Sequence, residues 1–242
     1  MGTNRHLDIL VVINEVARVE QEPVNIRHVC LACRIGLDAT GVAVYLVGAA
    51  QPVEAVGTAG DEMAELQATM GEGPTSEAVR RNQPVFVPNL ADGWSARRWP
   101  MLAPAAAAAG VAAVFVIPLT LGAIALGALE ICRDVDGPLS PDELADALLF
   151  ADTATTLLLG RPASPATLDG GDLWGTGPER KWGVVHQATG MVSVQLETDL
   201  GEAFLRLRAH AYLTGLRLSE VATEVVARRL RFTPDTNHEK QR

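Results

Sequence analysis

Apolar residues recur at helical spacing near the C-terminus, between residues 184 and 232. In the middle of this stretch they fall at intervals of four, three and four residues, which is the spacing of one helix face. The residues on that face are Leu200, Phe204, Leu207 and Ala211. Because short amphipathic helices cannot bury their apolar faces alone, the pattern predicts a small bundle of three helices. These helices are expected at about 185–196, 199–214 and 219–230.

Residues that start and stop helices agree with this bundle. Asp199, followed by Glu202, predicts an N-cap with a reciprocal carboxylate for the central helix. Gly215 is expected to end that helix, since glycine adopts the left-handed conformation at little steric cost. Ser219 is expected to cap the third helix.

The upstream part of the chain alternates between helical patterns and short apolar runs. Neighbouring runs rich in valine predict strands that pair as hairpins, and the prolines at 84 and 88 suit an edge strand. Ser140-Pro141, followed by two acids, predicts a helix start. Antiparallel strands with helices packed on them indicate an α+β fold. Helices are expected at 7–18, 24–37, 61–70, 74–81, 101–109 and 140–159, strands at 42–47, 53–57, 84–88, 111–119 and 123–133, and a loop holding Trp94 and Trp99.

A segment rich in proline and glycine separates the two patterns and has the composition of a linker. Trp174 is its one aromatic residue, and both docking on a domain and exposure remain open for it. The last ten residues are expected to form a disordered tail. The expected organisation is a first domain at 5–159, a linker at 160–178, a second domain at 179–232 and a tail at 233–242.

Charge is distributed unevenly along the chain. The net charge is −9, which by itself argues against binding a polyanion. Residues 1–179 hold 10 Lys and Arg against 22 Asp and Glu, whereas residues 180–242 hold 10 against 7. The first part therefore carries −12 and the second +3. Such a split is expected when only the C-terminal part contacts nucleic acid.

The longest apolar run, Gly110–Leu129, is interrupted by Pro118 and is predicted to form two strands and a turn rather than a membrane span. The N-terminus lacks the charged and apolar regions of a secretory signal. Three cysteines are a sparse and odd set, as in a reducing compartment. We therefore expect a cytoplasmic protein.

Cys30 and Cys33 form a CxxC pattern that requires its own interpretation. The helix expected over 24–37 places both thiols on its inward face, and no second ligand pair completes a zinc set. We therefore expect buried structural cysteines. The sequence also contains no phosphate-binding glycine motif, nucleophile elbow or zinc-helix motif, and a lone His28 is expected to be a core or surface residue. Catalytic residues, a metal site and a cofactor are not predicted.

The candidate chemistry lies beside the apolar face of the central C-terminal helix. A rotation of about 100° per residue places Arg208 and Tyr212 on one flank. The same rotation places Arg206 and His210 on the other. Cations beside an aromatic ring suit looped or single-stranded RNA, because phosphates bind the arginines and bases stack on the ring. A solvated face of extended arginines is the alternative interpretation.

Two motifs in this region resemble the ANTAR domain, an RNA-binding transcription antitermination module. One is A-x-G-x-[LM] at Ala188, Gly190 and Met191, and the other is A-F-x-x-L-R-x-x-A over Ala203–Ala211. The resemblance implies a dimeric three-helix domain that binds paired hairpins in nascent transcripts. Residues 195–198 depart from it, because family members often carry Gly before the second helix. The RNA-binding residues expected on this basis are Gln187, Gly190, Arg206, Arg208, His210, Tyr212, Arg217, Arg228 and Arg229.

The N-terminal part resembles a GAF domain of the actinobacterial kind that precedes ANTAR. The resemblance covers about residues 5–159 and rests on Gly71-Glu72-Gly73-Pro74 and on further short motifs as far as Leu139-Ser140. It implies a sensor and dimerisation module with an antiparallel sheet, together with an unidentified small-molecule ligand or a pocket filled by its own side chains. Family members often carry Cys after the Gly-Glu-Gly-Pro motif, whereas this chain has Thr75.

Three classes of function follow from these patterns. The first is a signal-responsive homodimeric regulator that binds RNA hairpins and acts in transcription antitermination. The second is a DNA-binding regulator with a helix-turn-helix, whose recognition helix would present Glu220, Thr223 and Glu224. Two of those residues are acids, which face phosphate unfavourably. The third is an enzyme on the GAF scaffold, such as a sulfoxide reductase, and would depend on reactive cysteines.

Overall fold

The computed structural model describes residues 2–160 and 182–233. It divides into two compact units, one formed mainly by residues 1–177 and the other by residues 178–242. The linker expected at 160–178, with Trp174, and the tail expected at 233–242 lie almost entirely outside the described residues. Within the described residues, no helix combines the length and the apolar character that crossing a bilayer requires.

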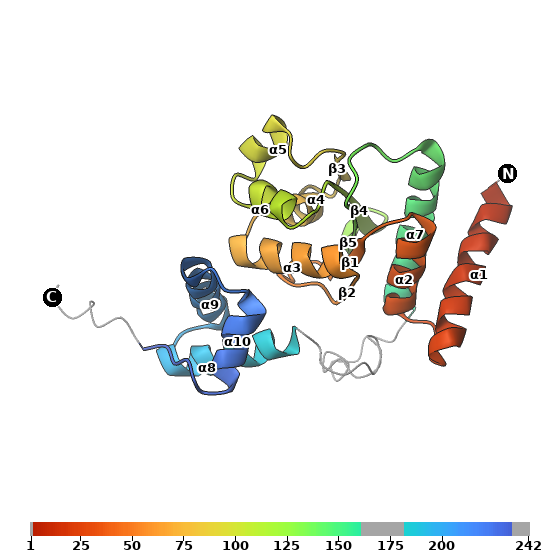
Figure 1. Cartoon of the computed structure of the whole chain (residues 1–242). Coiled ribbons are helices and arrows are strands. Elements are labelled where there is room, and N and C mark those ends of the chain that lie inside the picture. The colour runs from red at the N-terminus through yellow and green to blue at the C-terminus, as the bar shows by residue number, and fades with distance from the viewer. Residues whose placement is uncertain (1, 161–181, 234–242) are drawn as a thin grey trace. The chain divides into compact units, whose positions relative to one another are not determined.

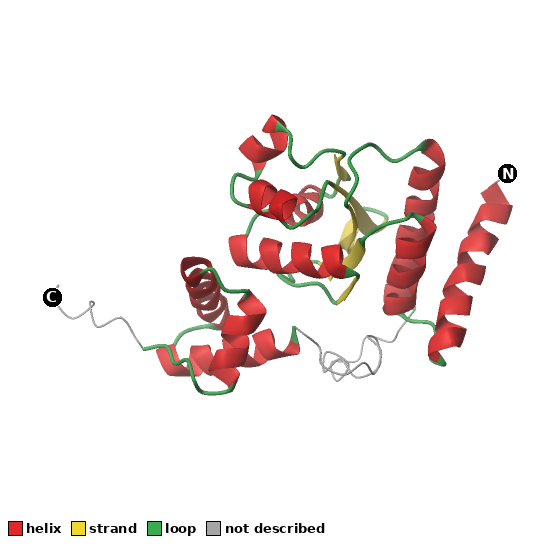
Figure 2. Cartoon of the chain, in the orientation of Figure 1, coloured by secondary structure: helices red, strands yellow, loops and turns green. Residues whose placement is uncertain are grey.

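The first unit is built on an antiparallel sheet of five strands, shown in yellow in Figure 2. The strand order is β2-β1-β5-β4-β3, and every neighbouring pair is antiparallel, as the sequence predicted. β3 forms one edge, so the prolines that flank it do not interrupt a ladder on both sides. The strands are β1 Gly41–Leu46, β2 Glu54–Val56, β3 Val85–Val87, β4 Ala113–Leu121 and β5 Ile124–Arg133.

Helices cover both faces of this sheet (Figure 1). α2 and α7 pack on one face, where α7 contacts β4 and β5 and α1 lies against α2 and α7. The helices from α3 to α6 lie toward the other face, and α4 contacts β4 and β5 there. The helices are α1 Gly2–Glu20, α2 Ile26–Gly36, α3 Thr58–Met70, α4 Pro74–Arg81, α5 Gly93–Arg98, α6 Leu102–Ala108 and α7 Pro141–Leu159.

Alternation along the strands assigns side chains to the two faces. Val42 and Val44 of β1 belong to the main hydrophobic core, together with Phe115 and Phe150 from β4 and α7. Their intervening neighbour Ala43 points to the opposite face and pairs with Glu130 of β5. The face that carries the main core is therefore apolar, whereas the other carries a charged residue.

The start of α7 is fixed by a reciprocal cap. Ser140 Oγ accepts a hydrogen bond from Glu143 N at 3.2 Å, and Glu143 Oε2 accepts one from Ser140 N at 2.7 Å. Pro141 occupies the first turn, where its missing donor costs nothing. The helix start predicted at this position is confirmed.

The loop expected around Trp94 and Trp99 was a wrong prediction, since residues 93–98 form α5. Asp92 caps this helix by accepting a hydrogen bond from Ser95 N at 2.6 Å. Arg98 stacks over the Trp94 ring at 4.3 Å and lies beside the Trp99 ring. The cap and these ring contacts stabilise a short helix that the local pattern alone does not indicate.

Over its described residues 182–233, the second unit contains three helices, α8 Gly183–Leu196, α9 Leu200–Thr214 and α10 Leu218–Val226. They pack on one another through small and β-branched residues that are fully buried. Asp199 caps α9 by accepting from Glu202 N at 2.9 Å, and Gly215 ends it with a φ of 67°. The N-cap at Asp199 and the stop at Gly215 are confirmed, whereas the Glu202 carboxylate accepts a hydrogen bond from Arg206 Nε at 2.9 Å and does not complete the expected reciprocal cap. The buried residues include Val185, Ala188, Val192, Ala203, Leu207, Ala211, Leu218, Val221, Ala222 and Val225.

Two details of the predicted bundle were wrong. Ser219 does not cap the third helix, because α10 begins one residue earlier and its N-cap position is Arg217, whose N donates to Glu220 Oε2 at 2.9 Å. Leu200 was expected on the buried face of α9, yet it is 62% exposed. It is the first helical residue after the Asp199 cap.

All three cysteines are fully buried, two in α2 and one in β5. Burial raises the pKa of each thiol, because the thiolate would lose its hydration. Cys30, Cys33 and Cys132 are therefore poor nucleophiles in the folded chain.

We predict that the native protein reacts with a thiol reagent at least about one hundred times more slowly than the denatured protein, because buried thiols are neither accessible nor ionised. The rate is read from the absorbance of the released thiolate at neutral pH. Fast labelling of two or more thiols in the native state would contradict the burial and would favour a redox enzyme.

Candidate functional site

The outer surface of α9 is the first candidate site. Ala203, Leu207 and Ala211 form the side that packs into the bundle, so the opposite side of the helix faces outward. Tyr212 is 52% exposed there, and Arg208, one turn earlier, is half-buried. Among the described residues Arg208 makes no ion pair. Its guanidinium and the Tyr212 ring are thus available to a ligand along the same flank.

The second flank of α9 is already occupied by interactions within the unit. Arg206 Nε donates to Glu202 Oε1 at 2.9 Å, which offsets part of the charge of this arginine. The His210 ring packs edge-on against Phe232, with ring centroids 5.5 Å apart. Of the two flanks that the sequence predicted, the one with Arg208 and Tyr212 is therefore better suited to stacking and phosphate contact.

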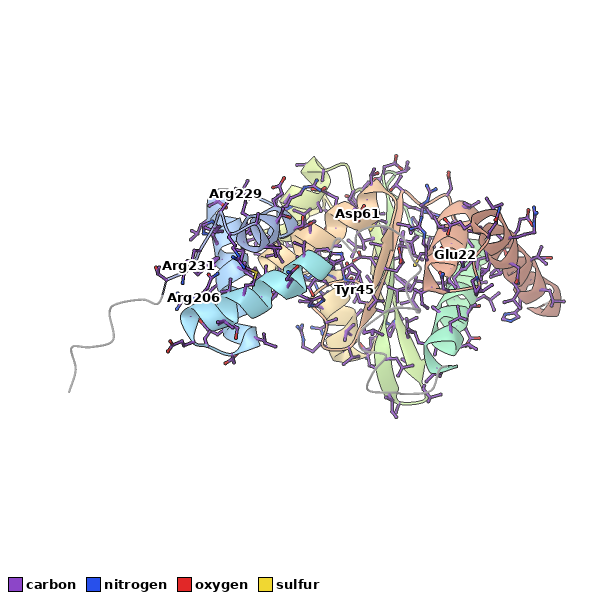
Figure 3. The ribbon with its side chains drawn as sticks, turned by 90° about the horizontal axis from the view of Figure 1, so that it is seen from below. Glu22, Tyr45, Asp61, Arg206, Arg229 and Arg231 are labelled. Atoms are coloured by element: carbon purple, nitrogen blue, oxygen red, sulfur yellow. The ribbon has the colours of Figure 1, made fainter. Side chains whose placement is uncertain are left out.

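The remaining predicted cations lie around α10, and Figure 3 shows Arg206, Arg229 and Arg231 on the same unit. Arg229 is exposed but forms two hydrogen bonds to Glu224, at 2.8 and 2.7 Å. This pairing lowers the pKa of Glu224. Arg228 is exposed and adopts a left-handed conformation with a φ of 60°. Arg217, also exposed, occupies the N-cap position of α10.

Gln187 and Gly190 lie on the outward side of α8. Gln187 is exposed, and a Cβ added to Gly190 would meet no atom within 4 Å. Glycine inside a helix costs about 1 kcal/mol relative to alanine. Packing inside the unit does not account for that cost, because an alanine side chain has room at this position.

A second candidate site is a buried carboxylate in the first unit. Glu130 of β5 is completely buried, on the sheet face opposite the main core. Its Oε2 accepts hydrogen bonds from Thr75 Oγ1 at 2.5 Å and from Gln67 Nε2 at 2.6 Å. Its Oε1 accepts one from Tyr45 Oη at 3.4 Å. The four side chains come from β1, α3, α4 and β5 and form what we call the Glu130 cluster.

The protonation of the Glu130 cluster is determined by two opposing effects. Burial raises the pKa of Glu130, while the hydrogen bonds from Thr75, Gln67 and Tyr45 act to lower it. Burial also raises the pKa of Tyr45 well above its usual value, and the nearby carboxyl reinforces this. The phenol therefore remains a hydrogen-bond donor at neutral pH.

The Gly-Glu-Gly-Pro motif supports the Glu130 cluster. Gly71 ends α3 with a φ of 71°, and Pro74 begins α4. Gly73 has a φ of 152°, and a Cβ there would lie 2.3 Å from Gln67 Oε1. Only glycine permits this close approach. The same Gln67 oxygen accepts a hydrogen bond from Thr75 N at 3.1 Å.

Sequence reasoning missed this cluster. One signal in the sequence was Glu130, an acid in the middle of the apolar run of β5. A buried carboxylate needs several hydrogen-bond donors, so an acid at such a position indicates polar partners elsewhere in the chain. The partners could not be found in this way, because they lie 55 to 85 residues away along the chain. Thr75, noted only for the absence of cysteine, is one of those donors.

Glu20, Glu22 and His28 form a third group, whose potential ligand atoms all lie within 4.8 Å of one another. His28 Nδ1 accepts a hydrogen bond from Asn25 N at 3.1 Å, so Nδ1 carries no proton. In the neutral ring the proton is then on Nε2, which lies 3.1 Å from Glu20 Oε2. This arrangement satisfies both ring nitrogens and caps α2, so we assign the group a structural role.

We predict that Thr75→Val lowers the free energy of unfolding by about 1–3 kcal/mol, because it leaves a buried carboxylate oxygen with one donor fewer. A carboxyl whose pKa is raised in the folded state stabilises the fold most below its usual pKa, and this contribution is lost as the pH rises through the raised value. Because the hydrogen bond from Thr75 lowers the pKa of Glu130, its loss in Thr75→Val raises that pKa further. The loss of unfolding free energy in Thr75→Val should therefore grow as the pH rises and the carboxyl ionises. Urea unfolding at several pH values measures it.

Thr75→Ser retains the hydroxyl and is the matched control. It should lose less than half as much stability as Thr75→Val, with no growth of the deficit at higher pH. Equal losses for the two variants would mean that the threonine methyl group, rather than its hydrogen bond, stabilises this region.

The chain is similar to several solved structures. Among solved structures, the GAF domain of an Acinetobacter phosphoenolpyruvate-protein phosphotransferase is 10% identical, with a TM-score of 0.45, over 63% of this chain and 96% of that chain. The type II free methionine-R-sulfoxide reductase of Thermoplasma acidophilum is 18% identical, with a TM-score of 0.42, over 59% and 92%. The GAF-B domain of DevS from Mycobacterium smegmatis is 21% identical, with a TM-score of 0.38, over 54% and 88%.

No curated protein sequence matches the chain. A family model does match, and its description is GAF domain. It covers residues 26–158, from the start of α2 to the end of α7, which is more than half of the 242 residues. On this match, and on the five-stranded sheet described above, the chain belongs to the GAF domain family.

Proposed function

We propose that this chain is a cytoplasmic, homodimeric, signal-responsive regulator that binds RNA hairpins in nascent transcripts and acts in transcription antitermination. The GAF domain is the sensor and dimerisation module. The three-helix unit formed by α8, α9 and α10 contacts the RNA. The sensor role is proposed from the family membership of the first unit, and RNA binding is proposed from the exposed side chains of the second.

The observation that supports RNA binding best is the flank of α9 with Arg208 and Tyr212. An exposed ring and a guanidinium without an ion pair among the described residues, one helical turn apart, can stack on a base and bind the adjacent phosphate. The excess of positive charge in residues 180–242 attracts a polyanion to this unit, and the acidic first unit repels it.

DNA binding through α10 is less well supported. Glu220 is exposed near the start of α10, and Glu224 follows one turn later. A recognition helix with two acids on its outward side would face phosphates at an electrostatic cost. Arg229 neutralises Glu224 but adds no net positive charge there.

The sensor role is proposed from the GAF domain and its Glu130 cluster. A buried carboxylate held by three side-chain donors is a polar centre that a small molecule with donor groups could reorganise. In this proposal a ligand acts by changing the arrangement of α3 and α4 around the carboxylate. The three buried thiols argue against a thiol-dependent enzyme on the same scaffold.

We predict that Arg208→Ala with Tyr212→Ala weakens binding to an RNA with two adjacent hairpins by at least about tenfold. Loss of one stacked base costs about 1–3 kcal/mol, and loss of a phosphate contact also lowers the salt dependence of binding. Filter-binding titrations at two salt concentrations measure both effects. Arg97→Ala is a control, because it removes an exposed arginine from the GAF domain and should leave RNA affinity unchanged.

Unchanged RNA affinity in the double variant would contradict the site. Competition with duplex DNA of equal length tests the alternative class. If DNA displaces the RNA at equal concentration, then the three-helix unit is not selective for RNA and the proposal is wrong.

We also predict that Gly190→Ala stabilises α8 by up to about 1 kcal/mol, as expected for a helix interior with free space. If RNA approaches α8 closely at this position, the same substitution should weaken RNA binding. Thermal unfolding and RNA titration measure the two effects separately. A stabilised variant with full RNA affinity would remove Gly190 from the site.

A further inference from the structure

The outward side of α9 carries a ridge of apolar residues beside the proposed RNA flank. Leu205, Ala209 and Leu213 are spaced four residues apart, so they form one line along the helix. All three are exposed, and Leu213 is 81% exposed. We call this line the α9 ridge. Leu216, 44% exposed, follows it just beyond the end of the helix.

RNA does not account for the α9 ridge. Leucine and alanine side chains offer neither charge nor hydrogen bonds to phosphate, and Leu213 is the ridge residue most distant from Arg208 around the helix. Contiguous exposed apolar residues of this kind mark a protein interface. The ridge therefore requires a partner surface that is itself apolar and shaped to fit a helix.

We infer that the α9 ridge packs antiparallel against the same ridge of a second copy of this chain, with Ala209 at the centre. In a two-fold interface, each residue pair occurs twice. The spacing is symmetric about Ala209, so Leu205 of one copy faces Leu213 of the other. The small Ala209 side chain lets the two helices approach closely where they cross.

The charges at the ends of α9 favour a second copy in the antiparallel direction. Glu202, whose Oε1 also accepts a hydrogen bond from Arg206 of the same helix, lies near the N-terminus of α9, and Arg217 lies just past its C-terminus. Antiparallel pairing about Ala209 brings Glu202 of each copy beside Leu216 and Arg217 of the other. A parallel pair would instead place like charges together. Antiparallel helices also bring opposite ends of their dipoles together.

The antiparallel interface also affects RNA binding, and this step rests on the proposed function. In an antiparallel pair, the same flank of each helix lies on the same side of the interface. The Arg208 and Tyr212 of both copies then border one continuous surface, with two rings and two guanidinium groups. Such a surface fits two adjacent hairpins better than either unit alone, because the second hairpin binds at a high effective concentration.

The test is disulfide formation in the full chain with Ala209→Cys. The native cysteines are buried, so only the new thiol is accessible to a mild oxidant. Helix axes about 8–10 Å apart place facing Cα atoms within the range of about 4.4–6.8 Å that a disulfide spans. We expect a covalent dimer as the main product on a denaturing gel without reductant.

Ala227→Cys is the matched control, because it also introduces an exposed thiol, at the end of α10 and away from the ridge. It should form at least about ten times less dimer in the same time, since no interface holds two such thiols together. Leu213→Glu, added to Ala209→Cys, should prevent the crosslink by placing two acids in the interface, with an unchanged circular dichroism spectrum. Leu213→Met should retain the crosslink.

Three results would overturn the interface. The first is crosslinking of Ala209→Cys no faster than that of Ala227→Cys. The second is an introduced thiol at position 209 that neither crosslinks nor labels, which would mean that another part of the same chain covers the ridge. The third is crosslinking that survives Leu213→Glu. RNA titration separates the two proposals: with a crosslink present, unchanged affinity after Arg208→Ala and Tyr212→Ala would remove the RNA function alone.

Discussion

The complete burial of one carboxylate constrains the GAF domain more than any other single interaction. Glu130 occupies the middle strand of the sheet, where its side chain is inaccessible to solvent. Burying such a group costs several kcal/mol unless hydrogen bonds replace its hydration. Three donors do so, and they come from segments distant in sequence. The position of α3 and α4 over the sheet is thereby coupled to the state of one ionisable group.

This coupling explains residues that would otherwise look unrelated. Gly73 is required because Gln67 must reach past it, and Gly71 turns the chain so that α4 can begin at Pro74. Glu72, between the glycines, accepts hydrogen bonds from the backbone N of Met101 and Leu102 at 2.8 and 3.0 Å and so caps α6. The motif therefore connects three helices around the carboxylate.

The parts of the fold that depend on neighbouring residues were predictable from the sequence. The valine-rich strand that begins near Val42, the cap at Ser140 and the stop at Gly215 each have their own physical reason, and the structure contains all three. Features that depend on distant partners were not predictable. α5 needs the ring contacts of Arg98, and the Glu130 cluster needs four separate segments.

The same distinction applies to the candidate RNA site. Helical periodicity located the flanks of α9 but could not show that Arg206 binds Glu202 or that His210 packs on Phe232. The residue pattern also gave no reason to single out Leu205 and Leu213, since exposure is a property of the assembled bundle. Once the bundle is built, its outward helix face divides into a cationic flank and an apolar ridge.

A weak pairing of two α9 ridges would make RNA binding responsive to the GAF domain. Few side chains contribute to the ridge, so two separate three-helix units would associate only at high concentration. A dimer of GAF domains would hold two three-helix units near each other, because a connecting segment joins each unit to its GAF domain. The effective concentration of the units would depend on how the length of that segment compares with the distance it has to span. In the proposed function, a signal that alters the GAF dimer would then change the occupancy of the ridge, and with it the number of hairpins bound at once. Because the coupling acts through concentration, it requires no rigid contact between the two units.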